Sequence, residues 1–498
     1  MSPVATRKIG AGRFDSHWGK QMRDAWRKIF IVRSQALLGV AASRKSMRRA
    51  LRPPVAFACV ILMVAISLTV APVFGQGVAD AALLAQINKI KAIDNHAHPQ
   101  VVLSAGQSDD NSTDYVAVEP IDPPVLLRPD NPKFMTAWRS LFGYPYHDAA
   151  PEHLRELTSS KQRIIAAQGD NYAAWVLDRL GIDVMLSNRV GMGRGLSAPR
   201  FRWVPYVDAL LYPLNNETAG SDNPDYRAAY VGLEKILKQF LADSRQEALP
   251  ASLDSYLANV VTPTLERLKS GGAIALKFDS AYIRSLSFDN VPRAEAAHIY
   301  AQHVGAASPA RAEYKALQDH IVRYIAGEAG RLGLPVHIHV GAGASSYFNQ
   351  FDANPFLLET LLNDPKLRQT RFVLLHGGLP NAKETRFLLY KPNVYADFSA
   401  QAFLTSTREL SEMLRSWLEF VPEKVLFGTD AFPVAGEIGW EEVGWLTATS
   451  GREALALALT GMLNDGEISR ERALELAAMV MRGNAVALYH LQAPEAVH

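Results

Sequence analysis

The stretch Asp94-Asn95-His96-Ala97-His98-Pro99 decides the fold that the sequence predicts. It begins the first convincing β-strand of the chain. Because side chains alternate between the two faces of a strand, His96 and His98 are expected to point the same way, while Asn95 points the other way. Two imidazoles on one face can bind one metal ion. The pair alone is a weak indication, since two polar residues at the end of an edge strand have the same spacing.

Three later strands strengthen this prediction because each carries a metal-binding residue type at its carboxyl end. Residues 334–341 form an apolar strand with two same-facing histidines, His337 and His339. The next apolar strand ends in His376, and a later one ends in Asp430. In a closed parallel barrel these ends converge on one face, which is where barrel enzymes carry their active sites.

Strands and helices alternate from residue 83 onward, which predicts a parallel sheet with helical crossovers. The expected fold class is α/β, a distorted (β/α)8 TIM barrel over residues 83–491. We find no internal repeat. The eight expected strands are 93–98, 183–189, 201–209, 273–280, 335–341, 371–378, 393–400 and 425–430.

Two insertions interrupt the predicted barrel on the face that carries the histidines. Residues 104–151 are rich in Pro, Asp and Asn, and residues 214–249 open with a turn-rich segment and end in a helix. Long loops at this face commonly act as lids that shape a pocket and exclude water. A surface elaboration or an oligomer contact is an equally good interpretation, and a homo-oligomer stays open.

The first 82 residues differ in composition from the rest. A basic segment precedes the uncharged run 55–71, which is followed by small residues. This pattern favours a signal peptide for export, periplasmic or extracellular, over a spanning helix, which usually needs about 20 apolar residues. The alternative is an uncleaved anchor, and the membrane is then contacted only through this segment. Residues 1–46 are interpreted as an upstream extension.

Charge and cysteine content exclude several function classes. The formal charge of +2 falls to −9 without residues 1–54, because 39 basic residues then face 48 acidic ones. An acidic body argues against nucleic acid as a partner. The single cysteine, Cys59, lies in the apolar run, so a disulfide framework, a thiol nucleophile and a cysteine-based zinc site are excluded.

The motifs Asp-Asn-His-Ala-His, Leu-Leu-His-Gly-Gly-Leu-Pro and Leu-Phe-Gly-Thr-Asp-Ala resemble those of the amidohydrolase superfamily. These local sequences are similar to those of its amidohydrolase-2 branch, and within that branch to those of the amidohydrolase domain found fused to glutamine-synthetase-like proteins. The resemblance covers 93–491. It implies a metal-dependent hydrolase in which His96, His98, His339 and Asp430 bind one divalent ion, with zinc expected.

The resemblance also implies catalytic roles, and simple chemistry agrees with them. A bound divalent ion lowers the pKa of its water toward about 7. Asp430 would take the proton of that water and pass it to the leaving group. His376 would polarise the substrate carbonyl or stabilise the oxyanion.

Lys277 ends the fourth strand, and its role stays open. Strand alternation places it with Ala273, Ala275 and Asp279 on the inward face. In mononuclear relatives a group here contacts substrate, which we favour. In binuclear relatives the lysine is carbamylated and bridges two metals, with His376 as an added ligand. A buried ion pair with Asp279 is the third interpretation.

Further candidates are predicted to contact the substrate. His337 lies one layer below His339 and is expected to support the ligands or touch substrate. Arg189, Tyr282 and Arg284 are expected to hold a substrate carboxylate. The sequence thus predicts an enzyme that cleaves an amide or other carbon–nitrogen bond of a small, carboxylate-bearing molecule. The alternatives are a nonoxidative metal-dependent decarboxylase and a non-catalytic metal-binding barrel.

Overall fold

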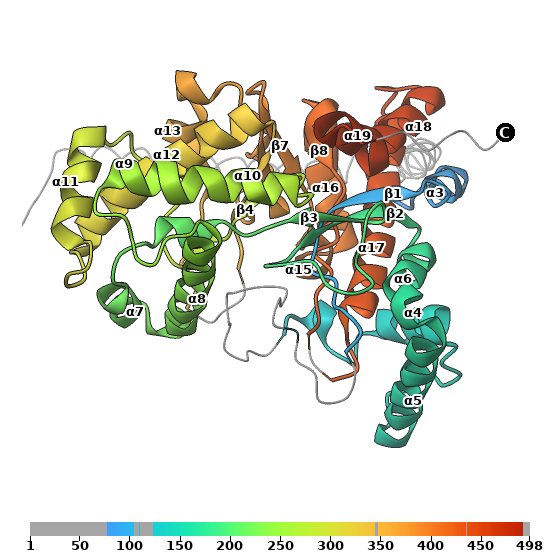
Figure 1. Cartoon of the computed structure of the whole chain (residues 1–498). Coiled ribbons are helices and arrows are strands. Elements are labelled where there is room, and N and C mark those ends of the chain that lie inside the picture. Colours follow the sequence, from blue (N-terminus) through green and yellow to red (C-terminus); the bar gives the residue numbers. More distant parts are fainter. Residues whose placement is uncertain (1–76, 104–108, 110–122, 344–346, 435, 492–498) are drawn as a thin grey trace, which may run out of the picture. The chain divides into compact units, whose positions relative to one another are not determined.

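The computed structural model describes residues 77–103, 109, 123–343, 347–434 and 436–491. Within these ranges, eight strands run parallel to their neighbours in two hydrogen-bonded groups, β1-β2-β3 and β4-β5-β6-β7-β8 (Figure 1). The strands are β1 (Ala92–Ala97), β2 (Ile182–Asn188), β3 (Phe201–Val204), β4 (Leu276–Phe278), β5 (Val336–His339), β6 (Phe372–Leu375), β7 (Val394–Asp397) and β8 (Val425–Leu426). All eight lie where the sequence predicted strands.

Backbone hydrogen bonds join the two groups of strands into a closed, distorted (β/α)8 barrel. Between β3 and β4, the N–H of Ile274 donates to the carbonyl of Trp203 at 3.0 Å. On the opposite seam, the N–H of Asn95 in β1 donates to Phe427, directly after β8, at 2.9 Å. The N–H of Asp430 donates to the carbonyl of His96 at 2.7 Å. The second seam therefore brings the first and last predicted metal-binding motifs side by side.

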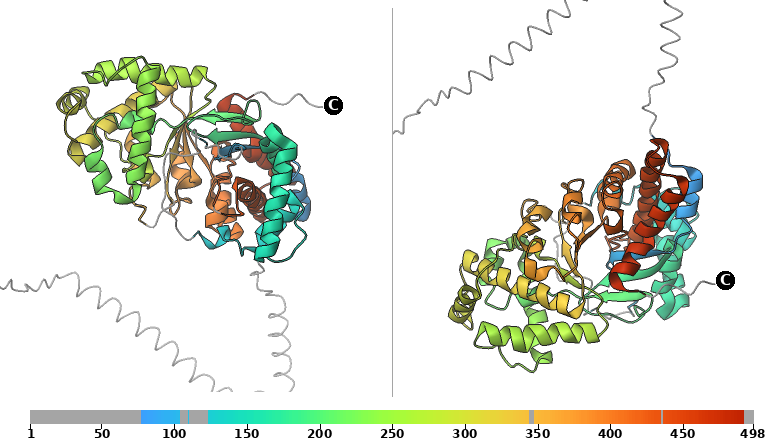
Figure 2. Two further views of the ribbon diagram at one scale, coloured as in Figure 1. Left: turned by 60° about the horizontal axis from the view of Figure 1, so that its bottom comes forward. Right: turned by 90° about the horizontal axis from the view of Figure 1, so that it is seen from above.

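The helices lie around the strands, as the two views of Figure 2 show. α17 packs against α16, α4 and α3, and α12 packs against α10 and α11. The α-helices are α3 (Ala81–Ile87), α4 (Pro132–Phe142), α5 (Pro151–Gln168), α6 (Tyr172–Leu180), α7 (Glu217–Asp222), α8 (Arg227–Asp243), α9 (Leu253–Tyr256), α10 (Thr262–Ser270), α11 (Arg293–His303), α12 (Arg311–Leu332), α13 (Glu359–Leu362), α14 (Arg386–Leu389), α15 (Gln401–Leu404), α16 (Thr407–Leu418), α17 (Trp440–Asn464), α18 (Arg470–Ala478) and α19 (Asn484–Tyr489).

Strand alternation separates the buried apolar side chains into two clusters. Phe372 and Leu374 of β6 belong to the large cluster between strands and helices, while Val373 and Leu375 belong to a smaller one. The smaller cluster draws residues from β1, β2, β3, β6 and β8 and includes Tyr489 of α19. Because it draws on strands from all around the barrel, it fills the barrel interior.

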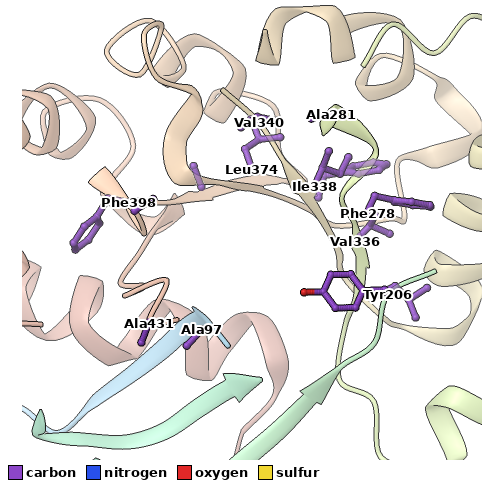
Figure 3. Close-up of a cluster of buried hydrophobic side chains, with 14 of the residues drawn as sticks. Ala97, Tyr206, Phe278, Ala281, Val336, Ile338, Val340, Leu374, Phe398 and Ala431 are labelled. Atoms are coloured by element: carbon purple, nitrogen blue, oxygen red, sulfur yellow. The ribbon is translucent and has the colours of Figure 1, made fainter. Parts of the chain in front are cut away.

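Figure 3 shows part of the large cluster of buried apolar side chains. Ala97 and Ala431 lie together where β1 approaches the end of β8, in agreement with the bond from the N–H of His98 to the carbonyl of Ala431 at 2.8 Å. Tyr206 lies across from them, near Val336. The metal-binding motifs are thus held in a buried frame.

The described parts of the insertions are partly helical. The first contains α4, whose start is capped by the Asn131 side chain and has Pro132 in its first turn, and whose end is Gly143 at φ 70°. The start and stop signals of a helix are thus present in the sequence of the first insertion, although its composition, rich in Pro, Asp and Asn, suggested a loop. The second contains α8, as its helical end predicted, and also the short helix α7 in the opening that was predicted to be turn-rich.

The predicted signal or anchor lies in residues 1–82, of which residues 1–76 are outside the described part. The barrel body begins with α3, whose first turn is capped by Asp80. Among the described residues, no helix combines the length and the apolar character needed to cross a bilayer.

Candidate metal centre

Three predicted ligands from the two ends of the barrel sequence converge on one point. Oδ1 of Asp430 lies 3.2 Å from Nε2 of His96 and 3.2 Å from Nε2 of His98. The three ligand atoms all lie within 4.8 Å of one another. His96 and His98 are buried, and the Asp430 side chain is 14% exposed. The centre is therefore shielded but open on one side.

Local hydrogen bonds fix the backbone that carries these ligands. Asp94 accepts the N–H of Thr429 at 2.9 Å and its hydroxyl at 2.6 Å. Burial raises the pKa of Asp94 to about 7, although these donors oppose the shift. Asp430 itself has φ 54°, a left-handed conformation uncommon for a residue with a side chain. The strand end is held in an unusual shape that turns the carboxylate toward the histidines.

Strand alternation alone does not explain the placement of the histidines. Asn95, predicted to point away from them, is fully buried and contacts Asp397 and Tyr489, groups of the barrel interior. The pairing of β1 with β2 is irregular between Asp94 and Ala97, which breaks the strict alternation there. The prediction for Asn95 was wrong, because a local irregularity changes which side chains face inward.

The donor set fits a divalent cation. Two imidazoles and a carboxylate are typical zinc ligands, and at Zn–N distances of about 2.0–2.1 Å tetrahedral ligands lie about 3.3 Å apart. The observed separations of 3.2 Å match this spacing. Burial and the nearby Lys277 hold the pKa of His96 well below its usual value. The ring is therefore neutral, which is the form that binds a metal.

His376 and His339 form a second pair beside this set. The His376 ring centroid lies 4.9 Å from that of His96 and 4.6 Å from that of His339. Nε2 of His376 is 3.1 Å from Nδ1 of His339. His339 is not part of the three-residue group, so its predicted role as a ligand stays a prediction. Its buried Nε2 has no hydrogen-bond partner among the described residues.

Sequence reasoning missed a hydrogen-bond network behind His376. Asp397, the last residue of β7, accepts the backbone N–H of His376 at 2.9 Å and the hydroxyl of Ser399 at 2.6 Å. The Ser399 hydroxyl also lies 2.9 Å from Nδ1 of His376. Asp397 ends an apolar strand as the predicted ligands do, so the same rule applied to the seventh strand would have found it.

His337 belongs to the interior side of this network rather than to the mouth. Its Nε2 lies 2.7 Å from the hydroxyl of Tyr489, which in turn donates to Asn95. His337 is fully buried, and burial lowers its pKa to about 3. This position fits the predicted supporting role. A contact with substrate stays a prediction.

Lys277 forms the buried ion pair that was one of its three interpretations. Its Nζ lies 2.8 Å from Oδ1 of Asp279, and the two side chains are 1% and 2% exposed. Asp208 accepts the N–H of Asp279 at 3.0 Å and the hydroxyl of Ser280 at 2.7 Å. The pair is therefore held by the chain itself. The favoured contact of Lys277 with substrate stays a prediction, and a carbamylated Lys277 with two metals stays an alternative.

Two of the remaining candidates, Arg189 and Arg284, are hydrogen-bonded to other groups of the protein. Arg189 is fully buried and binds the carbonyls of Gly191 and Pro99 and the carboxylate of Asp109. Arg284 donates to Asp319 at 2.5 Å and to Gln318 at 3.0 Å. Both guanidinium groups are thus engaged by the protein. Their roles as substrate contacts stay predictions.

Tyr282 lines a cavity of about 600 Å³ and also contacts His339. Its ring lies 4.7 Å from the His339 ring and 5.7 Å from that of Tyr226. The cavity is lined by residues of the second insertion, of the segment after β4 and of α12, including Tyr212, Tyr226, Arg284, Arg311 and Lys315. The predicted pocket-forming role of this insertion agrees with that position.

Comparison with known families decides the classification. The amidohydrolase family model Amidohydro_2 matches residues 237–491, slightly more than half of the chain. The chain belongs to the amidohydrolase family. The sequence-based resemblance to the amidohydrolase-2 branch is confirmed.

Individual relatives of this amidohydrolase are distant. Protein fluG of Emericella nidulans is 31% identical over 195 residues, which make up 37% of this chain and 21% of that protein. The chain thus spans about a fifth of this curated relative. A putative metal-dependent hydrolase from Lactobacillus casei has TM-score 0.50 and 16% identity, covering 83% of this chain and 98% of that one. Uronate isomerase from Thermotoga maritima has TM-score 0.49 and 12% identity, covering 82% and 96%. The first structure supports the fold alone.

Proposed function

We propose that this amidohydrolase is a metal-dependent hydrolase that uses metal-activated water to cleave an amide or other carbon–nitrogen bond of a small, carboxylate-bearing substrate. One observation carries the proposal. Two imidazole nitrogens each lie 3.2 Å from one carboxylate oxygen that comes from the opposite end of the barrel sequence. Such a set holds one divalent cation, expected to be zinc, and leaves a position for water.

The cation would supply Lewis-acid activation of water and of the scissile carbonyl. Asp430 is the group of the chain placed to hold a proton beside it. Burial works against ionisation of Asp430, but His376, His96 and His98 together hold its pKa well below its usual range. Asp430 is therefore an ionised acceptor at neutral pH. Its second oxygen, Oδ2, faces Nδ1 of His376 at 3.9 Å.

The cavity beyond Tyr282 is our candidate for the rest of the substrate. Its walls are rich in tyrosine, and it contains Arg311 at the start of α12. Arg284 and Lys315 also line it, but Asp319 pairs with both of them. Arg311 is exposed, and no ion pair of it is seen among the described residues, so it is the best-placed group to bind a substrate carboxylate.

A metal analysis and a substrate screen test the proposal. Purified protein reconstituted with Zn²⁺ is expected to bind one equivalent by elemental analysis. It is then expected to release amine and carboxylic acid from at least one member of a panel of N-acyl and γ-glutamyl amino acids. Release of CO2 without amine would replace hydrolysis by decarboxylation. Full metal occupancy without turnover of either kind would favour a binding protein.

A further inference from the structure

We propose that Asp397 and Ser399 are positioning residues that fix the tautomers of His376 and His339, so that Nε2 of His376 accepts a hydrogen bond from His339 and Nε2 of His339 keeps a free lone pair. This inference rests on the proposed metal-dependent function, because it concerns the form in which the histidines meet a cation. It follows from counting protons along the buried network behind His376.

The first step is that Asp397 accepts every hydrogen bond it makes. Its Oδ1 takes the N–H of His376 at 2.9 Å, the N–H of Ser399 at 3.2 Å and the hydroxyl of Ser399 at 2.6 Å. Its Oδ2 takes the amide of Asn95 at 2.7 Å. Backbone and amide N–H groups can only donate, so the carboxylate has acceptor contacts alone.

The second step concerns Ser399, whose hydroxyl has a single proton. That proton is donated to Asp397, so the hydroxyl oxygen must accept at its other contact, 2.9 Å from Nδ1 of His376. His376 therefore carries its proton on Nδ1. In a neutral imidazole the other nitrogen, Nε2, is then an acceptor.

The tautomer of His376 also determines the tautomer of His339. Nε2 of His376 lies 3.1 Å from Nδ1 of His339. Because the first nitrogen is an acceptor, the second must be the donor, and His339 carries its proton on Nδ1. Its Nε2 then has no proton and carries a free lone pair, and this atom is buried without a hydrogen-bond partner among the described residues. An unpartnered buried acceptor is the form that a cation or an acidic proton requires.

The interior side of the network holds Asp397 in place. Tyr489 gives its single proton to Asn95, so its oxygen accepts from Nε2–H of His337 at 2.7 Å. Asn95 in turn donates to Asp397. The order of donors runs from His337 through Tyr489 and Asn95 to Asp397. This arrangement explains why His337 is buried below the mouth.

The inference changes the chemistry expected of His376. A neutral His376 with its proton on Nδ1 has no N–H to offer an oxyanion from Nε2. Its Nε2 accepts the Nδ1–H of His339, so the nitrogen left to bind the cation or to accept a proton is Nε2 of His339. The family resemblance implied that His376 polarises the substrate carbonyl or stabilises the oxyanion, and both roles require a donor.

Nitrogen NMR of the side chains tests the tautomers without any substrate. In metal-free protein labelled with ¹⁵N-histidine, His376 is expected to show a protonated Nδ1 and an unprotonated Nε2, with its signals assigned by comparison with His376→Gln. Ser399→Ala is expected to abolish this single tautomer. The matched control is Ser416→Ala, a buried serine whose hydroxyl donates to Met413 inside α16. A protonated Nε2 in the wild type, or an unchanged pattern in Ser399→Ala, would overturn the inference.

Metal affinity gives a second readout. Competition with a chelator is expected to show that Ser399→Ala binds Zn²⁺ about 10–100-fold more weakly, the usual effect of removing a group that orients a ligand. Affinity equal to that of Ser416→Ala would contradict the positioning role. If the wild type itself bound no Zn²⁺, the proposed function would fail, while the tautomer measurement would still decide this inference.

Discussion

The two sides of the barrel mouth differ in how their charges are satisfied. On the side of β1 and β8, His96 and His98 share a single oxygen of Asp430, and Nδ1 of His96 has no partner among the described residues. On the side of β4, Lys277 pairs with Asp279 at 2.8 Å, and Asp208 braces the backbone behind them. The first side is arranged to receive a cation, whereas the second is already neutralised within the chain.

The two sides of the mouth should therefore respond differently to substitution. Removing a group from the side of β1 and β8 should affect metal binding before stability. Removing a group from the side of β4 should affect stability first, because it leaves a buried charge without its partner. The predictions below test that division.

The largest effect is expected for the double change His96→Ala with His98→Ala. Both nitrogen ligands are lost, so Zn²⁺ affinity should fall by more than the roughly 100-fold typical of outer-residue changes. Elemental analysis measures the metal, and circular dichroism checks that the barrel is folded. His320→Ala on the outer helix α12 is the control, since this ring contacts the carbonyl of Val291, which precedes α11. Undiminished metal content would contradict the assigned centre.

Lys277→Met should destabilise the protein by about 3–5 kcal/mol, because Asp279 would remain buried without its partner. Urea denaturation followed by far-UV circular dichroism measures the change. Combining it with Asp279→Asn should recover part of the loss, since both charges are then absent. A double variant less stable than Lys277→Met would contradict this, because Asp279 would then stabilise the fold by contacts other than its pairing with Lys277. Zn²⁺ affinity of either folded variant should change less than in the histidine variant.

Gly428→Ala tests how tightly the seam between β8 and β7 is packed. A Cβ there would lie 2.9 Å from Cβ of Ser399 and 3.1 Å from Oδ2 of Asp397. Both neighbours are buried, so we expect a loss of about 1–3 kcal/mol in the free energy of unfolding. Gly220→Ala in α7 is the control, because its nearest neighbour would lie at an ordinary 3.5 Å. Equal stability of the two variants would mean that the seam yields easily.

The smallest effect is a pH dependence from Asp208. Burial, with the charge of Asp279, raises the pKa of Asp208 from 3.8 to about 7. A raised pKa in the folded state means that the folded protein binds the proton more tightly. The free energy of unfolding therefore contains the full contribution of protonated Asp208 below pH 4. This contribution is lost as the pH rises through about 7, because the unfolded chain releases the proton first. Asp208→Asn should remove this dependence.

Urea denaturation of wild type and Asp208→Asn at several pH values between 4 and 8 measures the pH dependence that Asp208 gives to stability. The difference between the two proteins should shift in favour of the variant as pH rises, by an amount on the order of a kcal/mol or more. A constant difference across this range would show that Asp208 titrates normally.

Much of the candidate site could be predicted because parallel strands impose a simple rule. Polar residues at the carboxyl ends of apolar strands meet at one face, and this rule found His96, His98, His376 and Asp430. It did not find Ser399, which lies just past the end of β7, or Tyr489, which comes from the last helix. Neither residue stands out by composition, and only the packing of α19 under the barrel brings Tyr489 to Asn95.

The sequence by itself determined the eight strands, the inward position of Lys277 on the fourth and the residue types that gather at the mouth, because these depend on local periodicity and on the order of elements. The tertiary structure decided which of those residues touch. Asp430 joins His96 and His98 across the closing seam, His339 turns to His376, and Lys277 is taken by Asp279. Such pairings depend on irregular strand ends and on contacts between residues hundreds of positions apart, which no local pattern records.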